Sequence, residues 1–295
     1  MKVVAILNPI SGAGADVHAA EHRTALLASE LDRRGLRGHA EIHLTSHAGH
    51  ARALATAAVT GGAQLVLVWG GDGTANEAGT ALLESGVPLG LVPAGSGNGL
   101  AAALCTPRDP RAAIAAALDG PTRAIDVGRL GGRPFLNIAG IGVDARVASL
   151  FNLRAKGTRG RWPYILLGVT EGCRYAGRRY DIDLDGERLT LDALLIAFAN
   201  GAEYGNGVRL TAARPDDGVL DAVVIEDRSV LARFWHARHL VTGTADRAPR
   251  VLVRPVRHAV VRADGPMDYH VDGEPGRSEG PLEVTVHPRA LLVKG

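Results

Sequence analysis

Residues 64–76 read Gln-Leu-Val-Leu-Val-Trp-Gly-Gly-Asp-Gly-Thr-Ala-Asn, an apolar run that leads straight into a glycine-rich turn. Such a run is typical of a buried strand, and the bare amide N–H groups of the turn would normally attract an anion. Asp72 lies in the middle of the turn and would repel a phosphate unless a divalent cation lay between them. A tight turn explains the glycines but not the carboxylate among them. The stretch therefore predicts a site for a metal–nucleotide complex at the end of a buried strand.

The first third of the chain alternates strand-like and helix-like patterns around this stretch. We expect strands at residues 2–7, 40–44, 64–69 and 89–92, and helices at residues 16–34, 47–60 and 74–84. Strands that are separated by helices in this way favour a parallel sheet with helices on both faces. In such sheets, ligands bind beyond the carboxyl ends of the strands.

Three glycine- or proline-marked turns fall at the carboxyl ends of the expected strands. They read Asn8-Pro-Ile-Ser-Gly12, Gly70-Gly-Asp-Gly-Thr-Ala-Asn76 and Pro93-Ala-Gly-Ser-Gly-Asn98. The first and third turns, taken alone, are also compatible with ordinary turns before helices. Thr45, at the end of the second expected strand, carries no signal by itself. We expect the three turns to converge on one crevice, and this convergence is a stronger indication than any single turn.

The basic residues narrow the ways in which a phosphate could be bound. The 295 residues include only three lysines beside thirty arginines, and none of the lysines lies in a glycine-rich turn. The chain therefore lacks the G-x-x-x-x-G-K-[ST] pattern of a P-loop and its phosphate-binding lysine. Amide groups, arginine or a metal ion must neutralise any polyphosphate. The net charge of +2 gives no indication of a nucleic-acid partner.

The remaining composition fits a cytoplasmic protein. Cys105 and Cys173 lack the spacing of a metal or redox motif, so we expect free thiols in a reducing cytosol. No stretch approaches the roughly eighteen apolar residues of a membrane span. The apolar run at residues 3–7 is too short for a secretory signal.

From about residue 125 the pattern changes to short strands that are joined by turns. We expect strands at residues 126–130, 134–139, 180–184, 189–199, 251–253, 259–262, 269–271 and 282–286, and helices at residues 162–176 and 230–242. The predicted fold class is α/β + β: a three-layer α/β domain over residues 1–124 and a mainly antiparallel β-sandwich domain over residues 125–295. We allow the last residues of the chain to pack back on the first domain.

Two turns of the second half carry acidic residues that suit metal or proton chemistry. Residues 214–221 read Arg-Pro-Asp-Asp-Gly-Val-Leu-Asp, and this mixture of carboxylates and main-chain carbonyls suits a hard cation such as Mg²⁺. Asp272-Gly273-Glu274 follows an expected strand, and a carboxylate there could take the proton from an attacking hydroxyl. Taken alone, the first stretch is equally a plain acidic turn and the second is a hairpin tip.

Residues 146–179 combine positive and aromatic side chains. The positive residues are Arg146, Arg154, Lys156, Arg159, Arg161, Arg174, Arg178 and Arg179. Basic residues with amphipathic aromatics fit transient docking on an anionic bilayer surface. An arginine-rich face in water explains the segment equally well.

In their order along the chain, these motifs resemble the diacylglycerol kinase catalytic-domain family, which includes bacterial soluble lipid kinases, sphingosine kinases and ceramide kinases. The resemblance covers essentially the whole chain, since it also includes residues 137–144 and 200–207. It implies an α/β nucleotide-binding domain of the NAD kinase/diacylglycerol kinase type and a β-sandwich domain for a lipid substrate. It also implies transfer of the ATP γ-phosphoryl group to a lipid hydroxyl, within lipid metabolism and phospholipid biosynthesis. A cytoplasmic protein with peripheral membrane contact fits such a substrate, and a homodimer is left open.

The resemblance also implies roles for individual residues of the first half. Nucleotide contacts are expected from Asn8, Pro9, Ser11, Gly12, Thr45, Gly70, Gly71, Asp72, Gly73, Thr74, Ala75, Asn76 and Ser96. Asp72 would help to organise the catalytic Mg²⁺, so that ATP and Mg²⁺ are the expected cofactors.

In the second half, the resemblance implies a structural Mg²⁺ and a general base. The structural Mg²⁺ would be held by Asp217 with the carbonyls of Arg214 and Val219. Asp272 would be the general base, with Glu274 as the alternative. The resulting expectation is that acids from both halves of the chain meet around one cation-bridged triphosphate.

Two departures from the family pattern leave the lipid open between diacylglycerol and a sphingoid-like substrate. Residues 95–99 read Gly-Ser-Gly-Asn-Gly where many bacterial diacylglycerol kinases have Gly-Thr-x-Asn-Asp, and Asn206 replaces a glycine near the lipid site. The string at residues 93–98 is more similar to that of sphingosine kinases. Gly-Gly-Asp-Gly also occurs in NAD kinases and phosphofructokinases, so a soluble kinase of that kind is an alternative. A nucleotide or lipid sensor without catalytic activity is the other.

Overall fold

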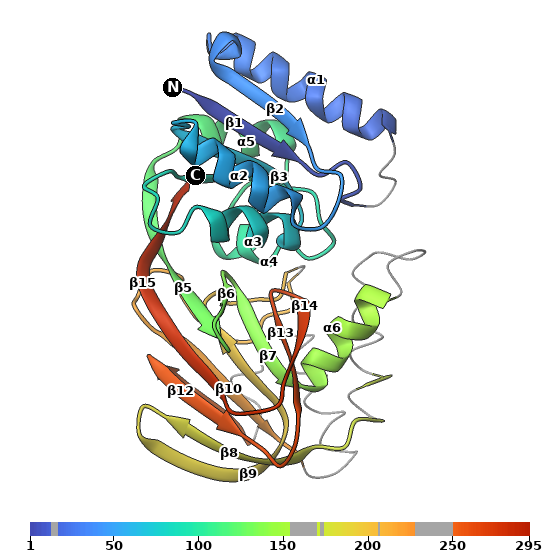
Figure 1. Cartoon of the computed structure of the whole chain (residues 1–295), viewed down its shortest axis with the longest axis vertical. Coiled ribbons are helices and arrows are strands. Elements are labelled where there is room, and N and C mark those ends of the chain that lie inside the picture. The colour runs from blue at the N-terminus through green and yellow to red at the C-terminus, as the bar shows by residue number, and fades with distance from the viewer. Residues whose placement is uncertain (13–16, 154–169, 172–173, 206, 228–249) are drawn as a thin grey trace. The chain divides into compact units, whose positions relative to one another are not determined.

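The computed structural model describes residues 1–12, 17–153, 170–171, 174–205, 207–227 and 250–295. The chain divides into two compact units, one formed by Met1–Ile125 with Arg289–Gly295 and the other by Asp126–Pro288 (Figure 1). The expected boundary followed residue 124. The expected helices at residues 162–176 and 230–242 lie largely outside the described residues.

The first unit is built on a parallel sheet. Its strands are β1 (Val3–Leu7), β2 (Ala40–Leu44), β3 (Leu65–Gly70) and β4 (Leu89–Pro93), in the order β4-β3-β1-β2. Every residue of β1 and β3 is buried, as expected for strands that are covered on both faces. In the register of the sheet, Leu7 lies beside Trp69 and Gly70 lies beside Pro93. The turns that follow these strands therefore start at the same edge.

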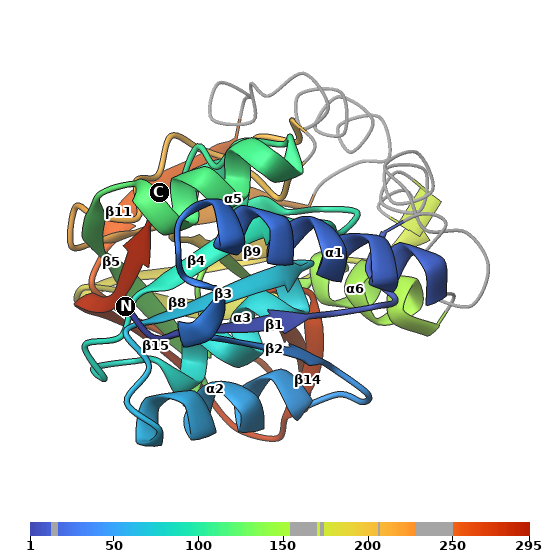
Figure 2. The same cartoon turned by 90° about the horizontal axis from the view of Figure 1, so that it is seen from above.

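Helices cover both faces of this sheet. They are α1 (Val17–Arg33), α2 (His50–Thr60), α3 (Asp72–Ala81), α4 (Gly99–Ala103) and α5 (Pro110–Asp119), with a 3₁₀ turn η1 (Arg37–His39). Figure 2 shows α1 and α5 on one side of the strands and α2 on the other. Leu27 of α1 and Leu118 of α5 pack with alternate residues of β1 and β3 in one core cluster. The α2 side is lined by small buried residues such as Ala51 and Ala55.

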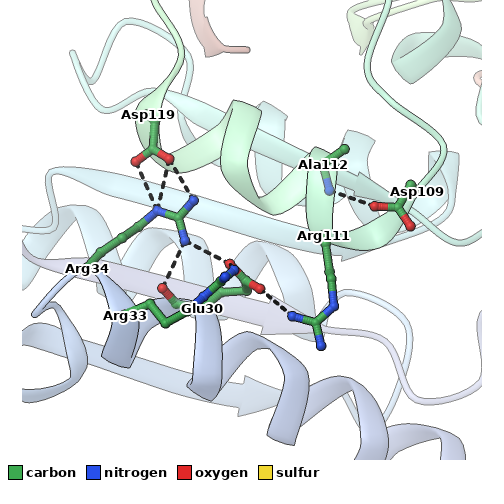
Figure 3. Close-up of polar contacts among 7 residues, drawn as sticks. All are labelled: Glu30, Arg33, Arg34, Asp109, Arg111, Ala112 and Asp119. Carbon is green, nitrogen blue, oxygen red and sulfur yellow. Dashed lines mark hydrogen bonds and ion pairs between the residues drawn. The ribbon is translucent and has the colours of Figure 1, made fainter.

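A buried ion-pair network joins α1 to α5 (Figure 3). The Glu30 carboxylate of α1 is only 1% exposed and binds Arg33, the last residue of α1, and Arg34, which follows it. It also lies 2.7 Å from Arg111 Nη1 of α5. Arg34 in turn binds Asp119, the last residue of α5, through its Nε and Nη2 atoms. The hydrogen bond from Arg33, followed by that from Arg34, lowers the pKa of Glu30 to about 2.

The second unit is built from antiparallel strands and one described helix. The strands are β5 (Thr122–Leu130), β6 (Arg133–Phe135), β7 (Ile138–Gly142), β8 (Arg178–Leu184), β9 (Glu187–Ala199), β10 (Leu220–Glu226), β11 (Val251–Val256), β12 (His258–Arg262), β13 (Met267–Val271), β14 (Glu274–Ser278) and β15 (Leu282–Lys294), and the helix is α6 (Val143–Leu153). The described pairings among β5 to β14 are antiparallel. Phe198 and Ala197 of β9 belong to two different apolar clusters, because neighbouring residues of a strand face opposite ways. An α/β unit followed by an antiparallel β unit confirms the predicted fold class.

One expected strand, at residues 134–139, is wrong. The structure ends β6 at Phe135 and starts β7 at Ile138. The backbone N–H groups of Leu136 and Asn137 donate to the Asp272 carboxylate, which interrupts the strand. No expected element covers α5, α6 or β10. Helix α3 begins at Asp72, two residues before the expected start at residue 74.

Strand β15 is longer than the expected strand at residues 282–286, because it contributes to both units. Within the second unit it pairs antiparallel with β12, where Leu282 lies beside Val261. Within the first unit its last residues pair parallel with β4, where Val293 lies beside Leu89. The end of the chain thus adds a strand to the parallel sheet.

Replacing Glu30 by glutamine should lower the free energy of unfolding at neutral pH by about 1–3 kcal/mol, because three arginines lose their ionised partner. Folding lowers the Glu30 pKa from its ordinary 4.5 to about 2. The contribution of Glu30 is therefore present above pH 4.5 and is lost as the pH falls toward 2. Denaturant unfolding of wild type and Glu30→Gln should show a stability difference that shrinks with acidification.

Glu21→Gln is the matched control, since Glu21 lies on the same helix and its side chain is 72% exposed. It should leave stability unchanged across the same pH range. A Glu30→Gln deficit that stays constant between about pH 5 and about pH 3 would contradict this account.

Candidate active site

The Asp72 carboxylate links two of the three predicted turns of the first unit. Asp72 is the first residue of α3, and its Oδ2 atom accepts the Asn98 N–H at 2.7 Å. Its Oδ1 atom faces the Leu100 N–H at 3.4 Å. Asn98 has a left-handed backbone (φ 57°) and its own side chain bonds both the N–H and the carbonyl of Gly95. The Mg²⁺ role of Asp72 stays a prediction.

Glycines allow the turns to come into direct contact. A Cβ atom on Gly95 would lie 2.6 Å from the Gly71 Cα atom, so position 95 excludes a side chain, and a Cβ atom on Gly71 would lie only 3.0 Å from the Gly95 Cα atom. Gly12 has a φ of +91°, and a Cβ atom there would lie 2.6 Å from the Ala94 carbonyl oxygen. The first and second turns each touch the third, which confirms the predicted convergence.

A hydrogen bond and an arginine fix the first turn. Asn8 Nδ2 donates to Thr74 Oγ1 at 2.9 Å, which ties the first turn to the second. Arg23 of α1 donates to the main-chain oxygens of Asn8 and Ser11, at 3.0 and 2.8 Å. Burial lowers the pKa of Arg23, and no carboxylate in the described ranges forms an ion pair with it. This guanidinium places a positive charge against the first turn.

The other predicted nucleotide residues lie on the same elements. Thr45 follows β2, and its N–H bonds the last carbonyl of β1. Gly73, Ala75 and Asn76 form the first turn of α3, and Pro9 follows β1. Ser96 lies half-buried in the third turn. The structure therefore places every predicted nucleotide residue at the carboxyl edge of the parallel sheet, while their contacts with a nucleotide stay a prediction.

In the second unit, Asp272 is held by backbone amides. Asp272 and Gly273 form the tip of the β13–β14 hairpin with positive φ angles of 46° and 86°, which confirms the expected hairpin tip. The Asp272 Oδ2 atom accepts the Leu136 N–H at 2.7 Å. The Oδ1 atom accepts the N–H groups of Asn137 and Ile138, both at 3.0 Å. Three charge-assisted hydrogen bonds thus fix the carboxylate. Its action as a base remains a prediction, as does that of the exposed neighbour at position 274.

A buried polar cluster with no predicted role lies beside this turn. His270 Nε2 and the Tyr204 hydroxyl lie 2.7 and 2.6 Å from Asp144 Oδ2, and the Gly273 N–H points to His270 Nδ1 at 3.2 Å. Burial alone would raise the pKa of Asp144, but His270 lowers it. Burial alone would lower the pKa of His270, but Asp144 raises it. Asp144 ends the motif at residues 137–144, yet no sequence signal pairs it with a histidine 126 residues away.

At the acidic turn of residues 214–221, the electrostatics of Asp217 favour a cation, but the number of nearby acidic ligands among the described residues is small. Burial raises the pKa of Asp217, and the charges of Asp126 and Asp221 raise it further. A bound cation would relieve this repulsion. Within the described ranges, no three His, Cys, Asp or Glu residues lie close enough to hold a metal together. Because Mg²⁺ commonly uses one or two carboxylates and several waters, Asp217 with the carbonyls of Arg214 and Val219 remains the predicted ligand set.

Within the basic segment at residues 146–179, residues 154–169 and 172–173 lie outside the described residues, and so does position 206. Arg178 is described: its guanidinium donates to the main-chain oxygens of Pro266 and Asp264 and lies 5.7 Å from the centre of the Tyr180 ring. This arginine therefore stabilises the fold of the second unit. None of the described helices has the length and the hydropathy that a membrane span requires.

Two family models match the chain. The diacylglycerol kinase catalytic domain matches residues 2–130, and the YegS C-terminal NAD kinase beta sandwich-like domain matches residues 137–295. A solved structure titled as a putative diacylglycerol kinase from Bacillus anthracis str. Sterne superposes with a TM-score of 0.82. It is 22% identical, and the match covers 99% of this chain and 94% of that one, which shows a common fold.

Curated relatives match over nearly the same length. A diacylglycerol kinase of Mycobacterium tuberculosis (strain ATCC 25618 / H37Rv) is 34% identical, over 99% of this chain and 94% of the relative. A probable lipid kinase YegS-like of Chromohalobacter salexigens is 29% identical, over 86% of this chain and 83% of the relative. Identity at this level over the whole length, together with both family models, shows common descent. The chain therefore belongs to the diacylglycerol kinase catalytic-domain family, a family of kinases.

Proposed function

We propose that this chain is an ATP-dependent lipid kinase that transfers the γ-phosphoryl group of ATP to a lipid hydroxyl. The observation that carries the proposal is the convergence of three turns at the carboxyl edge of the parallel sheet, where Asp72 joins the second turn to the third and Asn8 joins the first turn to the second. Nucleotides bind at this edge in α/β folds. The names of the relatives, diacylglycerol kinase and lipid kinase, support a lipid as the acceptor.

The chemistry of the residues fits phosphoryl transfer. Transfer of this kind needs positioning and charge neutralisation more than covalent catalysis. Turn amides, the Ser11 hydroxyl and the Arg23 guanidinium would hold the phosphates, in place of a P-loop lysine. A Mg²⁺ ion held through carboxylates would neutralise further charge when bound. Asp272 would accept the proton of the attacking hydroxyl.

The substrate class is a lipid with a free hydroxyl close to the membrane surface, either diacylglycerol or a sphingoid-like lipid. We propose that the protein reaches this substrate from the cytoplasm by transient contact with an anionic membrane. The third turn, with Gly-Ser-Gly-Asn-Gly at residues 95–99, supports a sphingoid-like substrate as well as diacylglycerol.

Purified full-length protein with radiolabelled ATP and Mg²⁺ should label one lipid in mixed micelles of diacylglycerol, sphingosine, ceramide and phosphatidylglycerol. NAD and fructose 6-phosphate are the comparison acceptors, because the same glycine-rich motif occurs in soluble kinases. Label in a lipid supports the proposal and names the lipid. Label only in NAD or the sugar phosphate would show a soluble kinase. ATP binding without any label transfer would show a sensor, and either result overturns the proposal.

Asp272→Asn should lower kcat on the labelled lipid by about 100-fold or more, because an asparagine amide cannot accept the proton. The affinity for ATP should stay within about twofold, because the predicted nucleotide residues lie in the other unit. Thermal unfolding should accompany the assay, since Asp272 also holds three backbone amides.

Glu274→Gln is the matched control at the exposed carboxylate of the same hairpin. It should keep most of the turnover. A loss in Glu274→Gln with normal turnover in a folded Asp272→Asn protein would assign the base to Glu274 and reject Asp272.

A further inference from the structure

His270 connects the buried cluster of the second unit to the turn that carries Asp272. It lies on β13, two residues before Asp272, and its side chain is only 3% exposed. One ring nitrogen, Nε2, lies 2.7 Å from Asp144 Oδ2, and the other, Nδ1, accepts the Gly273 N–H at 3.2 Å. Both nitrogens therefore have a defined partner from a different element.

These partners fix the tautomer of the ring. A backbone N–H can donate only to a nitrogen that carries no proton, so Nδ1 is bare and the proton of the neutral ring lies on Nε2. The Nε2–H then donates to Asp144 Oδ2, which also accepts the Tyr204 hydroxyl at 2.6 Å. The carboxylate thus orients the imidazole, in the way that carboxylates orient histidines in metal sites and catalytic triads.

The surrounding backbone is built to admit this cluster. A Cβ atom on Gly140 of β7 would lie 2.2 Å from Asp144 Oδ2 and 2.7 Å from His270 Nε2. The main chain behind both groups cannot move freely, because Asp144 lies in the first turn of α6 and His270 pairs with Gly140 in the β7–β13 ladder. Only glycine at position 140 leaves room for the hydrogen bond.

The turn at Asp272 and Gly273 is held by hydrogen bonds to two consecutive residues. Asp272 and Gly273 both have positive φ angles, a conformation that asparagine and glycine adopt more readily than aspartate. The amides of residues 136–138 hold the Asp272 carboxylate, and the Asp272 N–H bonds the Ile138 carbonyl. The His270 ring holds the next peptide, that of Gly273. The direction of the Asp272 carboxylate depends on both sets of contacts.

We propose that His270 is a positioning residue for phosphoryl transfer: Asp144 fixes its ring, and its Nδ1 atom holds the Gly273 amide so that Asp272 points at the lipid hydroxyl. This inference rests on the proposed function. An error of about 1 Å in the position of a catalytic group can cost about 100-fold in rate, so the contact is sufficient to control turnover.

Protonation of the ring would end this contact, because Nδ1 would become a donor that faces another donor. Three charged groups act on the ring: Asp144 on α6 and Asp272 on the hairpin tip favour the protonated form, and Arg133 on β6 opposes it. Tyr204 reaches the ring only through Asp144. Turnover should therefore have an acidic limb that depends on His270.

Two isosteric substitutions separate the two ring contacts. His270→Asn can place its carboxamide oxygen near the position of Nδ1 and accept the Gly273 N–H, but it is too short to reach Asp144. His270→Gln can donate to Asp144 from near the position of Nε2, but it leaves the Gly273 N–H without this acceptor. We expect His270→Asn to stay within about fivefold of the wild-type kcat and His270→Gln to lose about 10- to 100-fold, with the KM for ATP unchanged in both.

The control is Tyr204→Phe, which removes one hydrogen bond to Asp144 without touching the ring–Gly273 contact; its kcat should stay close to that of the wild type. The His270 acidic limb of the pH–rate profile should be absent in His270→Asn. Equal kcat losses in the Asn and Gln variants, or a larger loss in Asn, would overturn the proposal, because the ring would then act through packing or through Asp144 alone.

The contact between His270 Nδ1 and the Gly273 N–H can also be tested without an activity assay. In the wild-type protein labelled with ¹⁵N-histidine, NMR should show His270 with its proton on Nε2 and a bare Nδ1 at mildly alkaline pH. A proton on Nδ1 would overturn the proposal. Absence of label transfer by the wild type to any lipid would instead contradict the proposed function, so the two failures are distinguishable.

Discussion

Carboxylates that accept backbone N–H groups from distant turns are the interaction on which both halves of this protein depend. Asp72 accepts the Asn98 N–H, and Asp272 accepts those of residues 136–138. For these N–H groups, the carboxylate takes the place of the main-chain carbonyl that would accept them in a regular strand or helix. In each case an acidic residue that the motifs single out for chemistry also fixes the geometry of its own site.

These two roles of one carboxylate suggest how a lysine-poor chain could build the proposed phosphate site. A P-loop combines amides with a lysine, whereas here the amides come from three turns that glycines bring into contact and that Asp72 and Asn8 hold together. Arg23 lies beneath the first turn and adds positive charge without an acidic partner among the described residues. Asp72, Asn8 and Arg23 therefore hold the turns together and also set the polarity of the site, so a substitution at any of them should affect both the fold of the turns and the charge around them.

The first unit could be predicted well because its signals are local. Apolar runs that end in glycine turns define β1, β3 and β4 within about one residue. The register of the parallel sheet then brings the turns to one edge without further information. The start of α3 at Asp72 was placed too late because the two glycines around it read as turn residues rather than helix residues.

The second unit was harder to predict because its decisive contacts are long-range. Residues 134–139 have an apolar strand pattern, and only a carboxylate 134 to 136 residues away interrupts them. The same holds for the cluster of Asp144, Tyr204 and His270, whose members come from helix α6, the segment between β9 and β10, and strand β13. Neither periodicity nor composition records such pairings, so the contacts on which the proposed role of His270 rests are found only in the structure.

Amide hydrogen exchange, measured by NMR residue by residue, tests the carboxylate–amide interaction most directly. Relative to Leu67 in the core of β3, the Asp272→Asn protein should exchange faster at residues 136–138 while Asn98 keeps its protection, and Asp72→Asn should show the reverse. Unchanged protection at residues 136–138 in the Asp272→Asn protein, or at Asn98 in the Asp72→Asn protein, would contradict the account.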